Sequence, residues 1–375
     1  MSRAALSVLL AFVAAAVAQQ DPPGSTPLAE KHFSYPDGIP YKVDTLTGIR
    51  GTQSGYNMCN STTEGPESLC QTGFINHIDD WCVWAPPSGP TTIGDSEGDE
   101  VAWCTKPGRG TRIIPAGAIT GVQFLRAKSY VEVLAFFDQT LLNMTPDDFG
   151  GELDPHGRDL RGNPMGGLIY SNGLPMSGSG DNNTFTQVIE WHNFIGANFS
   201  CFKACDPQDP DAPNYCYNRL DRVGISYVCP NQAQNNVFEV CDSDNQDFVG
   251  VYTSDGQTLT YTQPADDVPI TMPYTARIPA SSNCVTYQST DLFPNLPTPT
   301  RAAASAGATP TGSGSGAGSP SRTGSAGSSP TGAKGSGSSS GGAAPTGGAA
   351  TGGAAALHGS AFAAFAGLAG AVFFL

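Results

Sequence analysis

Residues 129–137 read SYVEVLAFF, and together with residues 122–125 (VQFL) they decide the predicted fold class. Both segments are rich in β-branched and aromatic residues and alternate in part between apolar and polar positions, as β-strands do. Further short segments have the same character and are predicted to be strands: 168–170, 185–194, 224–229, 237–241, 248–253 and 258–262.

The segments between these predicted strands are rich in Gly, Pro, Asn and Asp, for example TPDDFGG at 145–151 and DPQDPD at 206–211. Such clusters form turns and loops. No amphipathic helix of three turns is recognisable. We therefore predict a mainly β domain, a disulfide-rich antiparallel β-sandwich or barrel with long loops.

The chain has ten cysteines, and all of them lie in this region. An even count in a chain with a secretory signal predicts five disulfides, whose pairing the sequence leaves open. A zinc site is not favoured, because the one close pair has neither a second pair nor a nearby His. We expect no metal and no cofactor. The cysteines are Cys59, Cys70, Cys82, Cys104, Cys201, Cys205, Cys216, Cys229, Cys241 and Cys284.

The N-terminal segment has the three parts of a signal peptide. Arg3 is followed by an apolar run, 4–17, that is too short to span a bilayer, and then by small residues. Cleavage is expected between Ala18 and Gln19.

The C-terminal end is an apolar tail of 15 residues, 361–375, with no basic residue after it. It follows a spacer, 351–360, and a triplet of small residues at 348–350. This order predicts a glycosylphosphatidylinositol (GPI) anchor, with attachment at Gly348 or a neighbouring small residue and removal of the tail.

The segment before the anchor consists almost entirely of Gly, Ser, Ala, Thr and Pro, a composition that cannot form a core. It is predicted to be a disordered stalk that carries O-glycans; an unmodified linker is the alternative. The predicted organisation is a signal peptide (1–18), a flexible mature N-terminus (19–32), a globular disulfide-rich β domain (33–293), the stalk (294–348) and a removed anchor propeptide (349–375).

Between the signal peptide and the stalk the chain carries 14 basic and 33 acidic residues and so a formal charge of −19. This charge disfavours nucleic acid and leaves the lipid anchor as the only expected membrane contact. Four sequons predict N-glycosylation on the surface of a secreted protein. They are Asn60, Asn143, Asn182 and Asn198.

Several motifs resemble catalytic or metal-binding sequences only formally, and we assign no catalytic residue. HIDDW (77–81) and EWH (190–192) contain possible ligands, but isolated His and carboxylates are more often structural. GDSEG (94–98) matches GxSxG without the required strand and helix around it. The acidic segment 242–247 lacks the Gly and closing Glu of a calcium loop. A glycosidase pair cannot be chosen among so many carboxylates.

Five stretches resemble a family of fungal secreted mannoproteins, labelled "macrofage activating glycoprotein" or immunoreactive mannoprotein. They are residues 51–62, 99–108, 150–164, 188–194 and 203–207. The resemblance extends from Phe33 to Cys284 and to the anchored end. It implies a surface glycoprotein with mannose-rich glycans. One departure is that Ile225 stands where the family pattern has Cys, with Cys229 four residues later.

Two functions follow as hypotheses. The favoured one is a non-enzymatic, GPI-anchored cell-surface or cell-wall mannoprotein that presents a glycosylated acidic ectodomain, with lectins or wall polysaccharide as partners of its glycans. The alternative is an anchored polysaccharide-binding protein or carbohydrate-active hydrolase, in which tryptophans stack on sugars. The same tryptophans could instead pack around disulfides. They are Trp81, Trp84, Trp103 and Trp191.

Overall fold

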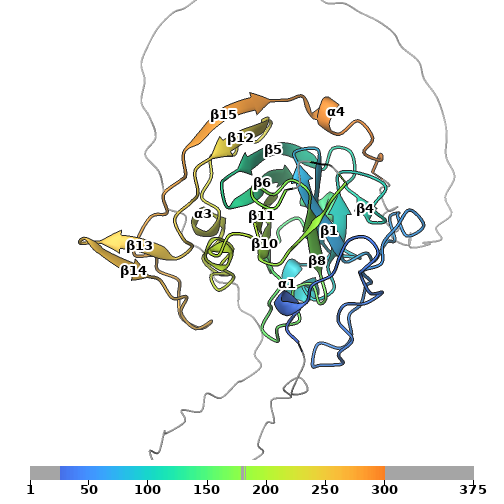
Figure 1. Cartoon of the computed structure of the whole chain (residues 1–375), viewed down its shortest axis with the longest axis horizontal. Coiled ribbons are helices and arrows are strands. Elements are labelled where there is room, and N and C mark those ends of the chain that lie inside the picture. Colours follow the sequence, from blue (N-terminus) through green and yellow to red (C-terminus); the bar gives the residue numbers. More distant parts are fainter. Residues whose placement is uncertain (1–25, 179–180, 182, 300–375) are drawn as a thin grey trace, which may run out of the picture. The chain divides into compact units, whose positions relative to one another are not determined.

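The computed structural model describes residues 26–178, 181 and 183–299 (Figure 1). The predicted cleavage site at Ala18 and Gln19, the sequon at Asn182 and the attachment residue Gly348 lie outside the described residues. Every helix in the described part has only three or four residues, and none of them is long and apolar enough to cross a membrane. The mainly β prediction is confirmed.

The larger sheet has seven strands in the order β15-β12-β5-β6-β11-β10-β7. Segments 122–125 and 129–137 form its antiparallel centre, β5 and β6, as predicted. The pairing of β5 with β12 is parallel, so the sheet is not purely antiparallel. The strands are β5 Ile119–Arg126, β6 Tyr130–Phe137, β7 Gly151–Leu153, β10 Trp191–Gly196, β11 Phe199–Cys205, β12 Phe238–Ser243 and β15 Ser281–Thr286.

A second sheet has six strands in the order β4-β3-β2-β1-β8-β9, with parallel pairs β1–β8 and β3–β4. The predicted strand 185–194 is divided between the two sheets, because its first part is β9 and its second part is β10. A separate hairpin joins β13 Val251–Ser254 to β14 Gln257–Thr260. The strands of the second sheet are β1 Thr72–His77, β2 Asp80–Ala85, β3 Val101–Cys104, β4 Arg112–Ile113, β8 Leu168–Ser171 and β9 Thr186–Val188.

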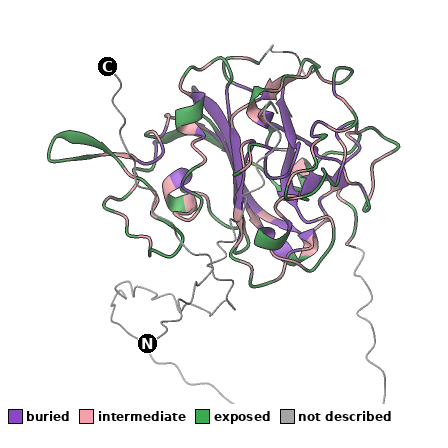
Figure 2. Cartoon of the chain, turned by 90° about the horizontal axis from the view of Figure 1, so that it is seen from below, coloured by how far each residue is buried: buried purple, intermediate pink, exposed green. Residues whose placement is uncertain are grey.

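The two sheets pack face to face, and their buried strands enclose one apolar core (Figure 2). Trp84 of the smaller sheet meets Trp191 of the larger one, with ring centroids 5.8 Å apart. The Trp84 backbone N–H also donates to Asn193 Oδ1 across the interface, at 3.0 Å. All four tryptophans are at most 6% exposed. The core-packing interpretation is therefore confirmed, and the hypothesis that these tryptophans stack on sugars is wrong.

The larger sheet is covered on its outer face as well. Along β6, Val131 and Val133 point into the interlayer core, whereas Leu134 points outward and packs with Leu220 and Val228. The cover comes from the chain after β11 and includes two short helices, α2 Ala212–Tyr215 and α3 Ile225–Val228 (Figure 1). Because both faces of the larger sheet are buried, polar side chains on either face are kept away from water.

Five disulfides hold the strands and the long loops, and no described cysteine is free, as predicted. Two of them fasten the helical cover to β11, and two others join neighbouring strands, β2 to β3 and β12 to β15. The fifth closes the loop before β1. The pairs are Cys59–Cys70, Cys82–Cys104, Cys201–Cys229, Cys205–Cys216 and Cys241–Cys284.

The prediction of a strand at 224–229 is wrong, because this segment forms α3. Gly224 has a φ of 87°, which turns the chain into the helix, and Cys229 ends the helix in a disulfide with Cys201. Ile225, the departure from the family pattern, packs against the apolar cluster beside that disulfide.

The limits of the folded part also differ from the prediction. Residues Leu28–Glu30, expected to be flexible, form a 3-10 helix (η1) with Leu28 buried. The remaining short helices lie before the predicted stalk. They are α1 Ile93–Ser96, η2 Gln139–Leu142 and α4 Ser289–Leu292. Pro297, inside the predicted stalk, still accepts a hydrogen bond from Ala116 N–H.

Candidate functional site

The structure does not bring the HIDDW residues together as a site. His77 is exposed at the end of β1, whereas Asp80 is buried and forms ion pairs with Arg109 and, at 3.8 Å, with Lys106. Asn76 also donates to Asp80 at 3.0 Å. Asp80 thus fixes the β1–β2 turn against the neighbouring loop.

Side chains of the GxSxG-like segment 94–98 and of the acidic segment 242–247 likewise form contacts within the protein. Ser96 ends the four-residue helix α1, and its Oγ lies within hydrogen-bond distance of Glu100 Oε1 (2.6 Å) and of Thr92 O (2.8 Å). Asp242 pairs with Arg126 at 2.8 Å, and Asp247 pairs with Arg277 at 2.7 Å. These side chains therefore have partners within the protein.

Two groups of His, Cys or carboxylate side chains in the described part have ligand atoms within 4.8 Å of one another. One joins His192 to Cys201 and Cys229, and the other joins Glu239 to Cys241 and Cys284. In each group the two cysteines are bonded to each other, so neither can act as a thiolate ligand in this state.

The most concentrated acid–base chemistry lies on the covered outer face of the larger sheet. Glu132 on β6, Lys203 on β11 and His192 on β10 are direct cross-strand partners, and Glu152 on the adjoining β7 pairs with Phe194 and so lies diagonal to His192 on the same face. We call these four residues the ionic row. Lys203 Nζ lies 3.5 Å from Glu132 Oε2, and His192 Nδ1 lies 3.8 Å from Glu152 Oε1.

Further contacts complete the surroundings of the ionic row. Lys203 Nζ donates to Val228 O (2.7 Å) and to Gln246 Oε1 (2.6 Å), both of which belong to the cover. The Cys201–Cys229 disulfide lies over the row, with Cys229 Sγ 3.5 Å from His192 Nε2. The cover is therefore held by the buried ammonium group of Lys203 as well as by disulfides.

Burial changes the protonation of the ionic row. It lowers the pKa of His192 well below its usual value, so this imidazole is neutral near pH 7, and it raises the pKa of Glu152 well above its usual value, which favours the protonated carboxyl. Burial also raises the pKa of Glu132 and lowers that of Lys203, and the attraction between the two opposes both shifts. Each of the four residues is at most 6% exposed. A dissolved substrate cannot reach them, and we assign the row a structural role.

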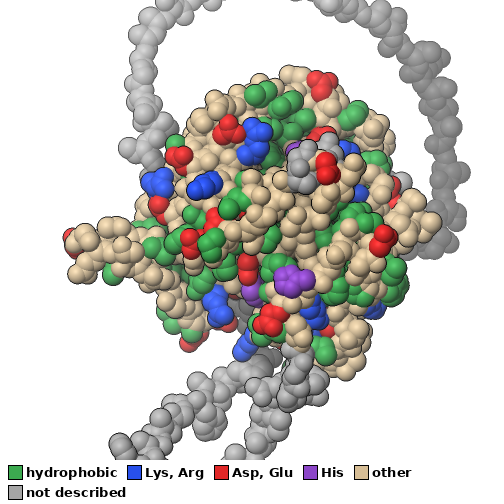
Figure 3. All heavy atoms as spheres, viewed as in Figure 1, with side chains coloured by type: hydrophobic (Ala, Val, Ile, Leu, Met, Phe, Trp, Pro, Cys, Tyr) green, Lys and Arg blue, Asp and Glu red, His purple; other side chains and the backbone are tan. Residues whose placement is uncertain are grey.

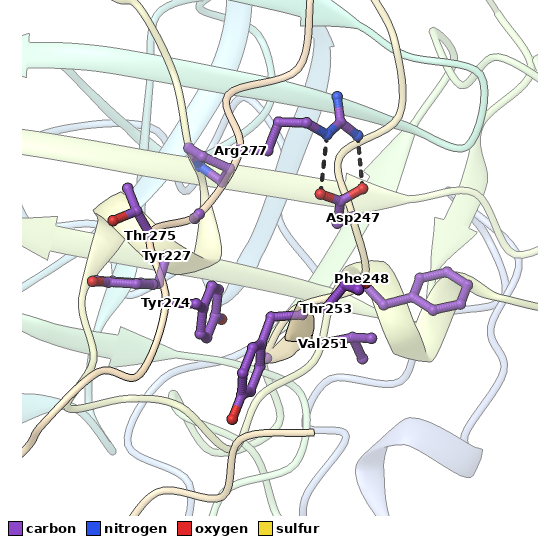
Figure 4. Close-up of a pocket in the computed structure, with 12 residues that line it drawn as sticks. Tyr227, Asp247, Phe248, Val251, Thr253, Tyr274, Thr275 and Arg277 are labelled. Carbon is purple, nitrogen blue, oxygen red and sulfur yellow. Dashed lines mark hydrogen bonds and ion pairs between the residues drawn. The ribbon is translucent and has the colours of Figure 1, made fainter. Parts of the chain in front are cut away.

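An accessible pocket of about 210 Å³ lies beside this cover, and we call it the tyrosine pocket (Figure 4). Tyr227 comes from α3, Tyr252 from β13 and Tyr274 from the segment after the hairpin. The rings of Tyr252 and Tyr274 stack with centroids 4.6 Å apart and planes 4° apart. Tyr227 meets Tyr274 edge-on at 5.4 Å.

The other end of the tyrosine pocket is polar. Arg277 donates to both carboxylate oxygens of Asp247, at 2.7 and 3.0 Å, and Figure 4 shows this pair apart from the tyrosine side chains. Both side chains are about half exposed. The Asp247 carboxylate raises the pKa of Arg277, so the guanidinium stays protonated. The carboxylate beside it balances this positive charge. On the face shown in Figure 3, acidic and basic side chains are similarly interspersed.

Comparison with known proteins identifies relatives in a fungus. Appressorium protein ROW2 of Mycosarcoma maydis is 34% identical to this chain over 271 residues, which cover 71% of this chain and 88% of ROW2. The chain belongs to this fungal family. Appressorium protein ROW1 of the same fungus is 38% identical over 232 residues, which cover 62% of this chain but only 51% of ROW1. No solved structure and no family model matches the chain.

The predicted sequons of this ROW family member lie in different surroundings. Asn60 and Asn198 are exposed, the latter at the β10–β11 turn. Asn143 is half-buried, and its Nδ2 donates to Pro86 O at 3.1 Å. Sequence reasoning identified these asparagines but missed the tyrosine pocket, because its three tyrosines are separated by more than 20 residues each.

Proposed function

We propose that this protein is a non-enzymatic glycoprotein of the fungal cell surface, secreted and then held by a GPI anchor. The observation that carries the proposal is the pairing of all ten cysteines in the described domain. Five disulfides in one domain are typical of proteins that fold in an oxidising, secretory compartment. The family relationship to two fungal appressorium proteins is consistent with a role at the surface.

The distribution of acid–base groups supports the non-enzymatic part of the proposal. The ionic row is enclosed, and Asp80 and Ser96 are used in local contacts. The domain is therefore proposed to act by presenting its surface and its glycans. Exposed Asn60 and Asn198 are the positions best placed to carry glycans that lectins or wall polysaccharide would contact.

The proposed anchor is supported by the order of small residues, spacer and apolar tail at 348–375. The test expresses the full chain in a fungal host and treats intact cells with a phosphatidylinositol-specific phospholipase. We expect release of a protein whose C-terminal peptide ends near Gly348. The control variant, Phe373→Asp with Phe374→Asp, interrupts the apolar tail and should not be attached.

Two results would overturn the anchor. One is a mature protein that retains residues 373–375 by intact-mass analysis, and the other is equal surface attachment of the control variant.

A further inference from the structure

The tyrosine pocket combines apolar ring surface with polar groups that remain available to a ligand. Its wall consists of three tyrosines whose rings are in mutual contact. The hydroxyl groups of Tyr227 and Tyr252 have no hydrogen-bond partner among the residues that the structure describes. A ring with an apolar body and a polar end suits a ligand that is itself both apolar and hydroxylated.

The charges at the polar end favour a neutral ligand. The bidentate pair uses Arg277 Nε and Nη2, so the N–H groups of Nη1 stay free to donate. Asp247 has accepted two hydrogen bonds and keeps further lone pairs. Because the Asp247 carboxylate already neutralises the guanidinium charge, an anion at Nη1 would gain little net attraction and would meet that carboxylate, whereas a hydroxyl group can use the remaining donors and acceptors without disturbing the pair.

The size of the tyrosine pocket limits what enters it. Its volume of about 210 Å³ is below the range of about 300–1,000 Å³ that holds a drug-sized ligand. A single hexose ring fits, and a longer chain would have to continue outside. The hairpin β13–β14 beside the pocket is largely exposed and leaves that path open.

From these observations we propose that the tyrosine pocket binds one glucopyranose unit of a neutral polysaccharide. A glucopyranose with equatorial hydroxyls presents C–H groups on both ring faces and hydroxyls around its edge. One of these faces can lie against tyrosine ring surface outside the Tyr252–Tyr274 stack, whose facing sides are 4.6 Å apart and closed to a ligand, and the edge matches the Asp247–Arg277 pair. The proposal deepens the proposed function by naming a partner of the protein domain itself. It rests on the proposed function only in one respect, that a protein at the cell surface would meet wall polysaccharide.

The test uses the purified, processed protein after enzymatic removal of its N-glycans and a soluble neutral β-glucan as the probe, with binding measured by calorimetry. A single hexose in so small a pocket should bind with a Kd of about 1 mM. We expect Tyr252→Ala to weaken binding about tenfold or more, since aromatic anchors dominate such contacts. Tyr252→Phe keeps the ring and should lose less affinity than Tyr252→Ala.

The matched control is Tyr41→Ala. Tyr41 is 59% exposed and stacks on Tyr56 with centroids 5.7 Å apart, away from the pocket-lining residues. This variant should bind as the unchanged protein does. Thermal unfolding of each variant establishes that a loss of binding is not a loss of the fold.

Three outcomes would overturn the proposal: no binding of the neutral glucan by the unchanged protein, equal binding by Tyr252→Ala, or tighter, salt-sensitive binding of an acidic polygalacturonate. The last would identify Arg277 as an anion receptor. Glucan binding is measured on purified protein, whereas the anchor is tested by phospholipase release from cells. Either result can be negative while the other is positive, so the two proposals are tested separately.

Discussion

Replacing Lys203 by methionine tests the structural role of the ionic row. Methionine has a similar length and leaves little cavity, but it removes the cation 3.5 Å from Glu132 and the donors to Val228 O and Gln246 Oε1. Lys203 is completely buried. Removal of one partner from a buried ion pair costs about 3–5 kcal/mol, because the other charge is left without compensation. We expect a decrease of this size in the free energy of unfolding at neutral pH.

The assay is equilibrium unfolding in guanidinium chloride with the disulfides intact. The matched control is Arg126→Met, which removes a cation from β5 of the same sheet but breaks an exposed pair with Asp242. Exposed pairs contribute about 0–1 kcal/mol. In a double-mutant cycle, Glu132→Gln should recover part of the loss caused by Lys203→Met, since it removes the uncompensated carboxylate.

The pH dependence gives a second measurement on the same variant. Without Lys203, the folded-state pKa of Glu132 should rise further. The buried carboxyl is then neutral at low pH, and its ionisation in the unfolded state lowers the free energy of unfolding as pH increases. The deficit of Lys203→Met should therefore grow between about pH 5 and about pH 8. A loss no larger than that of Arg126→Met, or additive effects in the cycle, would refute the structural reasoning.

Two further predictions concern buried and exposed polar groups. Burial raises the pKa of Glu100 well above its usual value, so the stability linked to its protonated form is present below the ordinary pKa of Glu and is lost as pH rises. Glu100→Gln should stabilise the protein at about pH 8 and flatten its unfolding free energy against pH; an unchanged slope would contradict this. Glycopeptide mass spectrometry should find Asn60 and Asn198 occupied to a greater extent than half-buried Asn143, and full occupancy of Asn143 would contradict the burial argument.

The sequence predicted the fold class because strand signals are local. The central strands β5 and β6 were recognised from their own residues, and the disulfide count followed from composition. The sequence predicts one strand over 185–194 because nothing in its apolar pattern shows that the chain changes sheets near Glu190. The strand predicted at 224–229 is wrong because a short apolar run suits either structure, and the turn at Gly224 leads into a helix instead.

The sites were less predictable because they depend on pairing between distant strands. Glu190 and His192 lie two residues apart in the EWH motif, whereas the structure pairs Glu190 with His156 at 3.0 Å and places His192 beside Lys203. One local sign was present in SYVEVLAFF. A single Glu in an otherwise apolar strand indicates that both faces of that strand are buried and that the carboxyl has a partner.

The ionic row also fixes the alignment of the strands that carry it. Both faces of β6 are apolar apart from Glu132, so hydrophobic residues alone would tolerate a displacement of the strand by one position. Because successive side chains point to opposite faces, such a slip would move Lys203 or Glu132 into the layer of tryptophans between the sheets, far from Val228 and Gln246. Misaligned pairings of the central strands are thus penalised by stranded charge, and a single arrangement of the sheet is selected during folding.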